Sequence, residues 1–313
     1  MLTYRLKKAF GPIRRVSENF VLKIARHVRS DYVSGVLRHA VHHRRVSLLV
    51  GQDTFSERIV LRNARPQPMF ERLSDKYEVR AFVRERVGSD YLIPLFGVVD
   101  RMSDFDFSTL PDAFVMKATH GSGWVRLVDD QHTECLETLR KLAGSWLNEN
   151  FYPNSRESHY KLIPPRIMFE QLLLQDGVPV DDYKIHCFRK NGRLTQILQI
   201  HSDRFGSHKV NFFSADWQTL DLSHGFARAP TEDVRKPEQL EHLLEVADRL
   251  STGMNYVRVD LYVSSGRVYF GELTFTPGAG LLRFQPQDAD HHWAALFDKD
   301  DHSSDPKLFL TGR

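Results

Sequence analysis

The stretch from Arg258 to Gly280 constrains the fold most, because it predicts two strands and places acidic residues inside them. Apolar and polar residues alternate over 257–263 and again over 267–276, and this period of two, rich in β-branched and aromatic residues, is typical of strands. Asp260 and Glu272 interrupt the apolar pattern. Unpaired buried carboxylates are costly, so these two need a partner, and a hard cation is the natural one.

The register of this hairpin decides whether the two carboxylates can share a cation. A two-residue turn sets Asp260 opposite Gly271 and thereby sends Asp260 and Glu272 to opposite faces of the sheet. A three-residue turn over 264–266 would instead set Arg258 opposite Glu272, so that all three charged side chains share one face. We therefore predict the three-residue, bulged turn.

The 313 residues suggest about two domains, since roughly 150 residues per domain is usual. Hydrophobic residues make up 41% and charged residues 27%, which is typical of a soluble protein with a sizeable core. No stretch approaches the ~20 apolar residues of a membrane span, and the N-terminus lacks the pattern of a signal peptide. Cys135 and Cys187 form no motif, so we expect reduced thiols in a cytoplasmic protein.

Charge is unevenly distributed along the chain. Residues 1–50 carry 11 Lys and Arg against Glu18 and Asp31, a balance of +9, so the total of +3 leaves −6 for the remainder. Apolar residues recur there at roughly helical spacing, which predicts a basic, mainly helical segment. Such a segment can contact an acidic membrane surface peripherally, or it can pack on the protein body with a solvated basic face. We favour packing, and we expect no nucleic-acid partner.

Residues 113–128 predict a strand, a glycine loop and a returning strand. Lys117 lies in the first strand, and the loop follows it directly. This order differs from the strand–loop–helix order of a P-loop or a dinucleotide fingerprint. A glycine hairpin can still lay its backbone N–H groups over phosphates, although most such hairpins are only turns. The strand lysine favours the phosphate interpretation, because an inward lysine needs an anion.

Residues 73–86 predict a helix that begins after Ser74 as N-cap. Lys76 and Arg80 are four residues apart and would share one face of it. Two such cations either flank an anion or are solvated and paired locally, and both alternatives are open.

Residues 182–188 predict a strand, with Asp182, Lys184 and His186 on one face. An acid, a lysine and a histidine that alternate in this way indicate a polar pocket. A solvated edge strand would have the same pattern, so the pattern by itself does not separate the two.

Four stretches resemble, in their order and spacing, the ATP-grasp superfamily, and they look closest to its TupA-like branch, named for teichuronopeptide synthesis. They are DKYEVRAFV, FVMKATHGSGW, DYKIHCF and FGELTFTPGAG. The resemblance covers roughly residues 70–285 and implies an α+β fold in which two subdomains clamp ATP. It divides the chain into a helical basic segment (1–70), a glycine-loop subdomain (about 112–165), a metal-binding subdomain (about 166–285) and a polar tail (286–313).

The resemblance also implies roles for individual residues. Lys76 and Lys117 would contact the phosphates of ATP. Arg258 resembles the arginine that steadies the acyl-phosphate and the tetrahedral intermediate, and Lys184, a ribose or phosphate contact, is our second catalytic candidate. The phosphate-covering loop would consist of His120, Gly121, Ser122 and Gly123. The linker that holds adenine through its backbone would consist of Glu170, Gln171, Leu172 and Leu173. Asp182 would be a further ribose or phosphate contact.

Asp260 and Glu272 resemble the family's magnesium ligands, with Glu272 as the bridge between two ions. The superfamily usually has Asn two residues after the bridging Glu, whereas this chain has Thr274. The resemblance therefore implies that Thr274 or Thr276 substitutes as a ligand, or that one ion is bound more weakly.

The expected function is that of an ATP- and Mg²⁺-dependent carboxylate–amine ligase, which forms an amide through an acyl-phosphate. Because the TupA-like branch is associated with acidic surface polysaccharides, the expected substrates are an amino acid or amine and a uronic-acid or glutamate carboxylate. Candidate contacts for the acidic acceptor are Arg80, Arg204, Lys209 and Arg283, although ordinary surface charges have the same appearance. The alternatives are a kinase acting on a sugar hydroxyl, a glycosyltransferase of the same pathway, and a non-catalytic glycan-binding protein.

Overall fold

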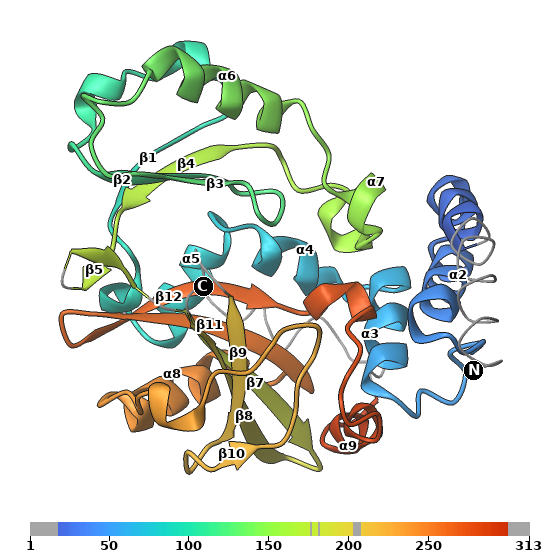
Figure 1. Cartoon of the computed structure of the whole chain (residues 1–313). Helices are drawn as coiled ribbons and strands as arrows, with labels where there is room; N and C mark the ends of the chain where they lie inside the picture. The colour runs from blue at the N-terminus through green and yellow to red at the C-terminus, as the bar shows by residue number, and fades with distance from the viewer. Residues whose placement is uncertain (1–17, 176, 181, 203–207, 300–313) are drawn as a thin grey trace, which may run out of the picture.

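The computed structural model describes residues 18–175, 177–180, 182–202 and 208–299. It contains two antiparallel sheets, and Figure 1 shows the four-stranded one, covered by α6, above the six-stranded one. The four-stranded sheet has the order β1-β4-β2-β3, with β1 Leu95–Val99, β2 Phe114–Ala118, β3 Val125–Val128 and β4 Ile167–Gln171. The strands of this sheet extend from 95 to 171, so β1 and β4 lie outside the limits of 112–165 that we predict for the glycine-loop subdomain.

The six-stranded sheet has the order β10-β9-β8-β7-β11-β12. Its strands are β7 Asp182–Lys190, β8 Arg193–Ser202, β9 Lys209–Ser214, β10 Thr219–Leu220, β11 Tyr256–Ser264 and β12 Arg267–Thr274. A small hairpin of β5 (Leu174–Gln175) and β6 (Val178–Pro179) follows the upper sheet along the chain. Asn191 and Gly192 form a tight turn between β7 and β8, with Lys190 paired to Arg193.

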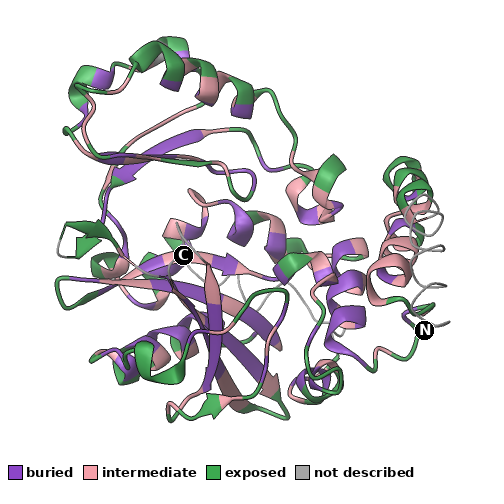
Figure 2. Ribbon diagram, viewed as in Figure 1, coloured by how far each residue is buried: buried purple, intermediate pink, exposed green. Residues whose placement is uncertain are grey.

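Helices cover both faces of the six-stranded sheet, and Figure 2 shows that many residues of its strands are buried. One core cluster combines α5 and α8 with the strands, and a second combines α3 and α9 with the opposite strand face. After a helix over 18–27, the described α-helices are α2 Asp31–His43, α3 Phe55–Ala64, α4 Pro68–Ser74, α5 Val79–Arg86, α6 Leu136–Leu147, α7 Tyr152–Ser155, α8 Leu240–Ser251 and α9 Ala289–Ala295.

The described part of the basic N-terminal segment is mainly helical, and α2 packs on the protein body. α2 lies beside α3 (Figure 1), and His43 at its end is hydrogen-bonded through Nε2 to the carbonyl of Gly280 at 3.0 Å. Arg38 of the same helix donates to the carbonyl of Ser155. Residues 1–17 of the predicted segment lie outside the described residues. Across the described ranges, no helix combines the length and apolar character that crossing a membrane requires.

The helix predicted over 73–86 is two helices. Ser74 is the last residue of α4 rather than an N-cap. The carboxylate of Asp75 accepts the N–H groups of Tyr77 and Glu78 at 2.8 and 3.2 Å, and this capping interaction starts a new helical turn. Lys76 therefore lies in the turn between α4 and α5, so it does not share a helix face with Arg80.

The segment predicted as a polar tail contains α9. Its Trp293 is 4% exposed and packs in the core with Phe55 and Phe188. Seven residues are too few for a helical period to stand out from a polar sequence, which explains the wrong prediction for 286–299. Residues 300–313 of the predicted tail lie outside the described residues.

Buried histidines make the stability of the fold sensitive to acid. Burial lowers the pKa of several histidine side chains, and it lowers that of His159 to about 3. A group with a lowered folded pKa contributes stability that is present above its unfolded pKa of ~6.5 and is lost as pH falls below that value. Histidines with a pKa lowered in this way include His39, His159, His186, His201 and His224.

We therefore expect the melting temperature to fall between pH 7.5 and pH 5. His159 alone accounts for about 2 kcal/mol at pH 5, because that pH is ~1.5 units below the unfolded pKa. Thermal unfolding of His159→Gln should show a smaller pH dependence, whereas the exposed control His132→Gln should keep that of the wild type. Equal slopes for all three proteins would contradict the assignment.

Candidate active site

The turn of the β11–β12 hairpin is shorter than the sequence predicts. Ser264 pairs with Arg267, which leaves Ser265 and Gly266 as a two-residue turn with φ of 50° and 75°. Positive φ at both central positions is typical of a type I′ turn, whose twist matches that of the paired strands. The predicted three-residue turn is therefore wrong.

A β-bulge at Gly271 nevertheless brings the two carboxylates to one face. It shifts the register after the turn, so that Asp260 pairs with Glu272 and Arg258 pairs with Thr274. A Cβ on Gly271 would lie only 3.0 Å from the carbonyl oxygen of Asp260, so a side chain at this position would disturb the bulge. The common face predicted for the charged residues exists, and a bulge inside the strand produces it.

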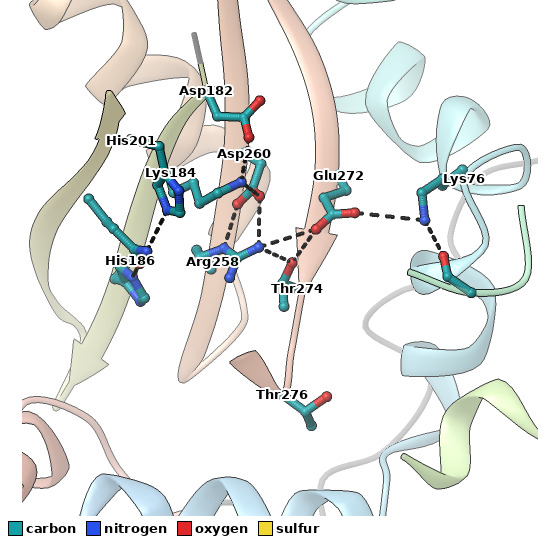
Figure 3. Close-up of polar contacts among 12 residues, drawn as sticks. Lys76, Asp182, Lys184, His186, His201, Arg258, Asp260, Glu272, Thr274 and Thr276 are labelled. Atoms are coloured by element: carbon teal, nitrogen blue, oxygen red, sulfur yellow. Dashed lines mark hydrogen bonds and ion pairs between the residues drawn. The ribbon is translucent and has the colours of Figure 1, made fainter. Parts of the chain in front are cut away.

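Arg258 lies at the centre of this face (Figure 3). Its Nε and Nη2 donate to the two carboxylate oxygens of Asp260 at 2.6 and 2.7 Å. Nη2 also reaches Glu272 Oε1 at 3.2 Å and Thr274 Oγ1 at 2.9 Å. Burial alone would lower the pKa of Arg258, but the charges of Asp260 and Glu272 raise it above its ordinary value. The guanidinium is therefore a permanent charge held in one orientation.

Lys184 adds a second cation from the neighbouring strand β7. Its Nζ donates to Asp260 Oδ2 at 2.6 Å and to Asp182 Oδ2 at 3.0 Å. Burial would raise the pKa of Asp260, but Arg258 and Lys184 outweigh it and hold that pKa below its usual range. The face of β7 that the sequence left open is thus a polar cluster rather than a solvated edge.

Lys76 joins this cluster to the glycine loop. Its Nζ lies 3.7 Å from Glu272 Oε2 and donates to the carbonyl of Gly121 at 2.5 Å. Burial lowers the pKa of Lys76, and the charge of Glu272 opposes this shift. Glu272 keeps 32% of its side-chain surface accessible, so it still faces incoming groups. Figure 3 shows Lys76 reaching β12 from the side opposite to Arg258.

A second ion-pair cluster lies on the four-stranded sheet. Glu170 of β4 forms an ion pair with Lys117 at 2.5 Å and accepts a hydrogen bond from Arg80 at 2.7 Å, and all three side chains are largely buried. Arg80 also donates to the carbonyl of Ile93 at 2.9 Å. Because its guanidinium is bound to Glu170, the geometry argues against Arg80 as a contact for an acidic acceptor.

The glycine loop joins β2 to β3 as predicted. His120 is 3% exposed, and its Nε2 lies 3.0 Å from the carbonyl of Trp146 in α6. Burial lowers the pKa of His120. Its ring therefore anchors the loop to α6, and a contribution of His120 to phosphate binding would come from its backbone. Ser122 and Gly123 are exposed at the tip of the loop.

The family described as TupA-like ATPgrasp matches residues 57–298, most of the chain. The chain belongs to the TupA-like ATP-grasp family. The match includes both sheets and the Arg258 cluster, whereas α2 lies outside it. No curated protein matches this chain.

Solved structures of similar fold include D-alanine–D-alanine ligases. The enzyme from Helicobacter pylori has 16% identity and a TM-score of 0.37, with 72% of this chain and 57% of that chain covered. The enzyme from Bacillus anthracis has 17% identity and a TM-score of 0.40, with 66% and 57% covered. N5-carboxyaminoimidazole ribonucleotide synthetase from Thermus thermophilus has 15% identity and a TM-score of 0.39, with 66% and 46% covered. The TupA-like chain thus spans about half the length of these proteins.

The residues at the bulge fit a magnesium ion in their donor chemistry. Mg²⁺ takes oxygen ligands and is usually held by one or two carboxylates together with substrate phosphates. Glu272 fits best, because it is partly accessible and, among the described residues, its Oε2 has an ion-pair contact only with Lys76, at 3.7 Å. Thr274 donates to Glu272 Oε1 at 2.9 Å and lies beside it. Both oxygens of Asp260 already accept hydrogen bonds from cations, so it would use its remaining lone pairs.

Thr276 does not join this oxygen cluster. Its hydroxyl donates to Glu157 Oε1 at 2.5 Å, and Figure 3 places it apart from Glu272 and Thr274. Of the two threonines that could replace the usual Asn, Thr274 is therefore the one that contacts Glu272.

The predicted adenine linker leaves the sheet at the end of β4. Gln171 donates its backbone N–H to the carbonyl of Pro94, while Leu172 and Leu173 are 9% and 7% exposed. Glu170 directs its carboxylate to Lys117 and Arg80. Any contact of the linker with adenine would therefore involve backbone groups beyond Glu170.

The remaining acceptor candidates are scattered. Lys209 begins β9, three strands away from β11 in the sheet order. Arg283 is exposed beside α2, with Nη2 3.4 Å from the carbonyl of Val41. Arg204 lies outside the described residues. Lys209 and Arg283, the two remaining candidates among the described residues, do not lie at one place.

Sequence reasoning missed a polar line that continues from the cluster. His186 bonds Tyr256 and Gln199, each at 2.8 Å, and Gln199 bonds His201 at 2.7 Å. Burial and the charge of Arg258 hold the pKa of His186 well below its ordinary value. Alternation placed His186 on the correct face, but only the pairing of β7 with β8 reveals its partner Gln199.

Proposed function

We propose that this protein is an ATP- and Mg²⁺-dependent carboxylate–amine ligase that forms an amide through an acyl-phosphate. The observation that carries the proposal is the position of Arg258, which holds Asp260, Glu272 and Thr274 together on one sheet face. Lys76 supports it, because this lysine connects Glu272 to the glycine loop. Family membership supports the same reaction type.

The charges of the cluster suit a reaction between two anions. Lys76, Lys184 and Arg258 carry three positive charges against the carboxylates of Asp182, Asp260 and Glu272, so the protein groups balance one another. ATP and a substrate carboxylate repel each other, and positively charged groups fixed beside both offset that repulsion. Mg²⁺, when bound, would neutralise phosphate charge and polarise the γ-phosphoryl group.

The reaction has two steps. A carboxylate oxygen of the acid attacks the γ-phosphorus, the bond to the β-phosphate oxygen breaks, and ADP leaves. The amine nitrogen then attacks the acyl carbon, the bond between carbon and the phosphate oxygen breaks, and inorganic phosphate leaves. Lys76 and Lys117 would orient the phosphates, and Arg258 would stabilise the charge that develops on the acyl oxygen.

We further propose an acidic acceptor, either a uronic acid or a glutamate carboxylate of a surface polysaccharide, and an amino acid or amine as its partner. The basic segment over residues 1–50 supports an anionic acceptor, with peripheral contact to a membrane or to a lipid-linked glycan. The structure is compatible with this proposal, because the chain on either side of α2 carries exposed cations, namely Lys23, Arg26, Arg29 and Arg44.

An ADP-release screen tests the proposal. Amino acids and simple amines are paired with uronic-acid and glutamate-containing acceptors in the presence of ATP and Mg²⁺, with Glu272→Gln as the blank. We expect ADP and phosphate to appear in equal amounts, only when both an acid and an amine are present. ADP formed without an amine, together with a stable phosphoester, would identify a kinase. Thermal stabilisation by UDP-sugars but not by ATP would identify a glycosyltransferase.

A further inference from the structure

We propose that Glu157 binds the ammonium group of the amine substrate and accepts one of its protons. This role deepens the proposed ligase function and rests on it. Glu157 lies in the segment 151–165, which connects α6 of the upper subdomain to β4 and which the sequence predicts only as a loop.

The carboxylate of Glu157 lies near enough to the Arg258 cluster for the charge of Glu272 to raise its pKa. It accepts a hydrogen bond from Thr276 Oγ1 at 2.5 Å. Thr276 follows Thr274 by two residues, and the Thr274 hydroxyl contacts both Arg258 and Glu272. An amine held by Glu157 would therefore lie beside the groups that we assign to the acyl-phosphate.

Glu157 differs from the other acids of the site in its partners. Asp260 is paired with Arg258 and Lys184, and Glu170 is paired with Lys117 and Arg80. Among the described residues, no cation lies within 4 Å of the Glu157 carboxylate, whose hydrogen bond comes from a hydroxyl. A largely buried carboxylate without a cation at contact distance is unfavourable, and a substrate ammonium would supply a positive charge closer than that of Arg38.

Charged and titratable groups approach Glu157 from several elements. Burial raises its pKa to about 7, while hydrogen bonds from Thr276 and Ser155 and the charge of Arg38 in α2 limit the rise. Glu272 of β12 pushes the pKa of Glu157 upward. Tyr160 also faces this group, and burial together with Glu157 raises the pKa of its phenol. A general base works best when its pKa lies near the working pH, so this environment suits proton transfer near neutrality.

The proton balance of the second step then closes. The ammonium gives one proton to the Glu157 carboxylate and becomes a neutral amine with a free lone pair. That lone pair forms the carbon–nitrogen bond as the bond between carbon and the phosphate oxygen breaks. The second proton leaves the nitrogen for the departing phosphate, and Glu157 returns its proton to solvent.

Hydroxylamine separates the two steps experimentally, because it is a neutral nucleophile at pH 7 and needs no base. The acid that releases most ADP in the screen is incubated with ATP, Mg²⁺ and either its amine or hydroxylamine, and amide and hydroxamate are measured. For Glu157→Gln we expect about a 10²-fold loss of amide formation, the usual size of general-base catalysis, with hydroxamate formation close to the wild-type rate. Glu149→Gln, an exposed acid just before the same segment, should behave as wild type.

Two further measurements keep the test independent of folding. In the wild type, the kcat/KM for the amine should rise with pH through about 7, and Glu157→Gln should lose this step. Thr276→Val removes a hydrogen bond to the carboxylate, so it should shift the step to higher pH without changing hydroxamate formation. Equal losses of amide and hydroxamate, or no loss of either, would overturn the role of Glu157. Absence of hydroxamate with wild-type protein would overturn the ligase function itself.

Discussion

Glu272→Gln is expected to lower kcat by about 10²–10³-fold, the effect of removing one preorganised charge contact from an active site. Glutamine keeps the shape of the side chain but loses the negative charge that faces Lys76 and Arg258. It is also a poorer ligand for Mg²⁺, so the Mg²⁺ concentration that gives half-maximal activity should rise. The measurement is steady-state ADP release at saturating ATP, with Mg²⁺ varied.

Glu241→Gln provides the matched control, because Glu241 is an exposed acid of α8. It should leave both kcat and the Mg²⁺ dependence unchanged. Activity of Glu272→Gln within a few-fold of wild type, with an unaltered Mg²⁺ dependence, would show that Glu272 is not a metal-bridging residue.

Arg258→Lys is expected to have a comparable effect, about 10²–10³-fold on kcat, although the charge is conserved. A lysine has one compact ammonium, so it cannot span Asp260, Glu272 and Thr274 as the planar guanidinium does. The lost hydrogen bonds to buried charge should also reduce the free energy of unfolding by about 1–3 kcal/mol. Activity and thermal unfolding should be measured on the same preparations.

The control for this substitution is Arg189→Lys. Arg189 lies near the C-terminal end of β7, away from Lys184 at the other end of the strand, and makes an ion pair with Asp248 of α8. It should lose little activity, whatever it loses in stability. If Arg258→Lys remained fully active, Arg258 would be an anchor for Asp260 and not a catalytic residue. ATP binding, measured as a thermal shift, should persist in both variants, because the proposed phosphate contacts Lys76 and Lys117 are unchanged.

Much of the candidate site follows from local patterns. Strand alternation placed Lys184 and His186 on one face, and the type of residue marked Asp260 and Glu272 as groups in need of partners. The resemblance in motif order predicted the family, and the match over residues 57–298 confirms it. Such inferences succeed because alternation and motif spacing depend on residues a few positions apart.

The prediction of the hairpin reached the correct face for the wrong reason. The residues of the turn do not reveal a bulge at Gly271, because the bulge depends on how closely the Asp260 carbonyl and the Tyr262 ring of the paired strand approach that glycine. The ion-pair partner of Arg80 could not be predicted for a similar reason. Its partner Glu170 is 90 residues away in the chain, and only the packing of α5 against the upper sheet brings them together.

Glu157 is the clearest example of a residue that no local pattern could find. It lies in an irregular segment, and its partner Thr276 is 119 residues away. Nothing in the residues around Glu157 in the chain indicates that burial will raise the pKa of its carboxyl group.

By itself, the sequence determined the strands, their charged face and the family, because these depend on periodicity and on the order of short motifs. The tertiary structure decided which charges meet. It joined Lys76 to Glu272, paired Arg80 with Glu170 and joined Glu157 to Thr276. The physical reason is that ion pairing and burial depend on distance in space, which the chain sets only when its distant segments pack together.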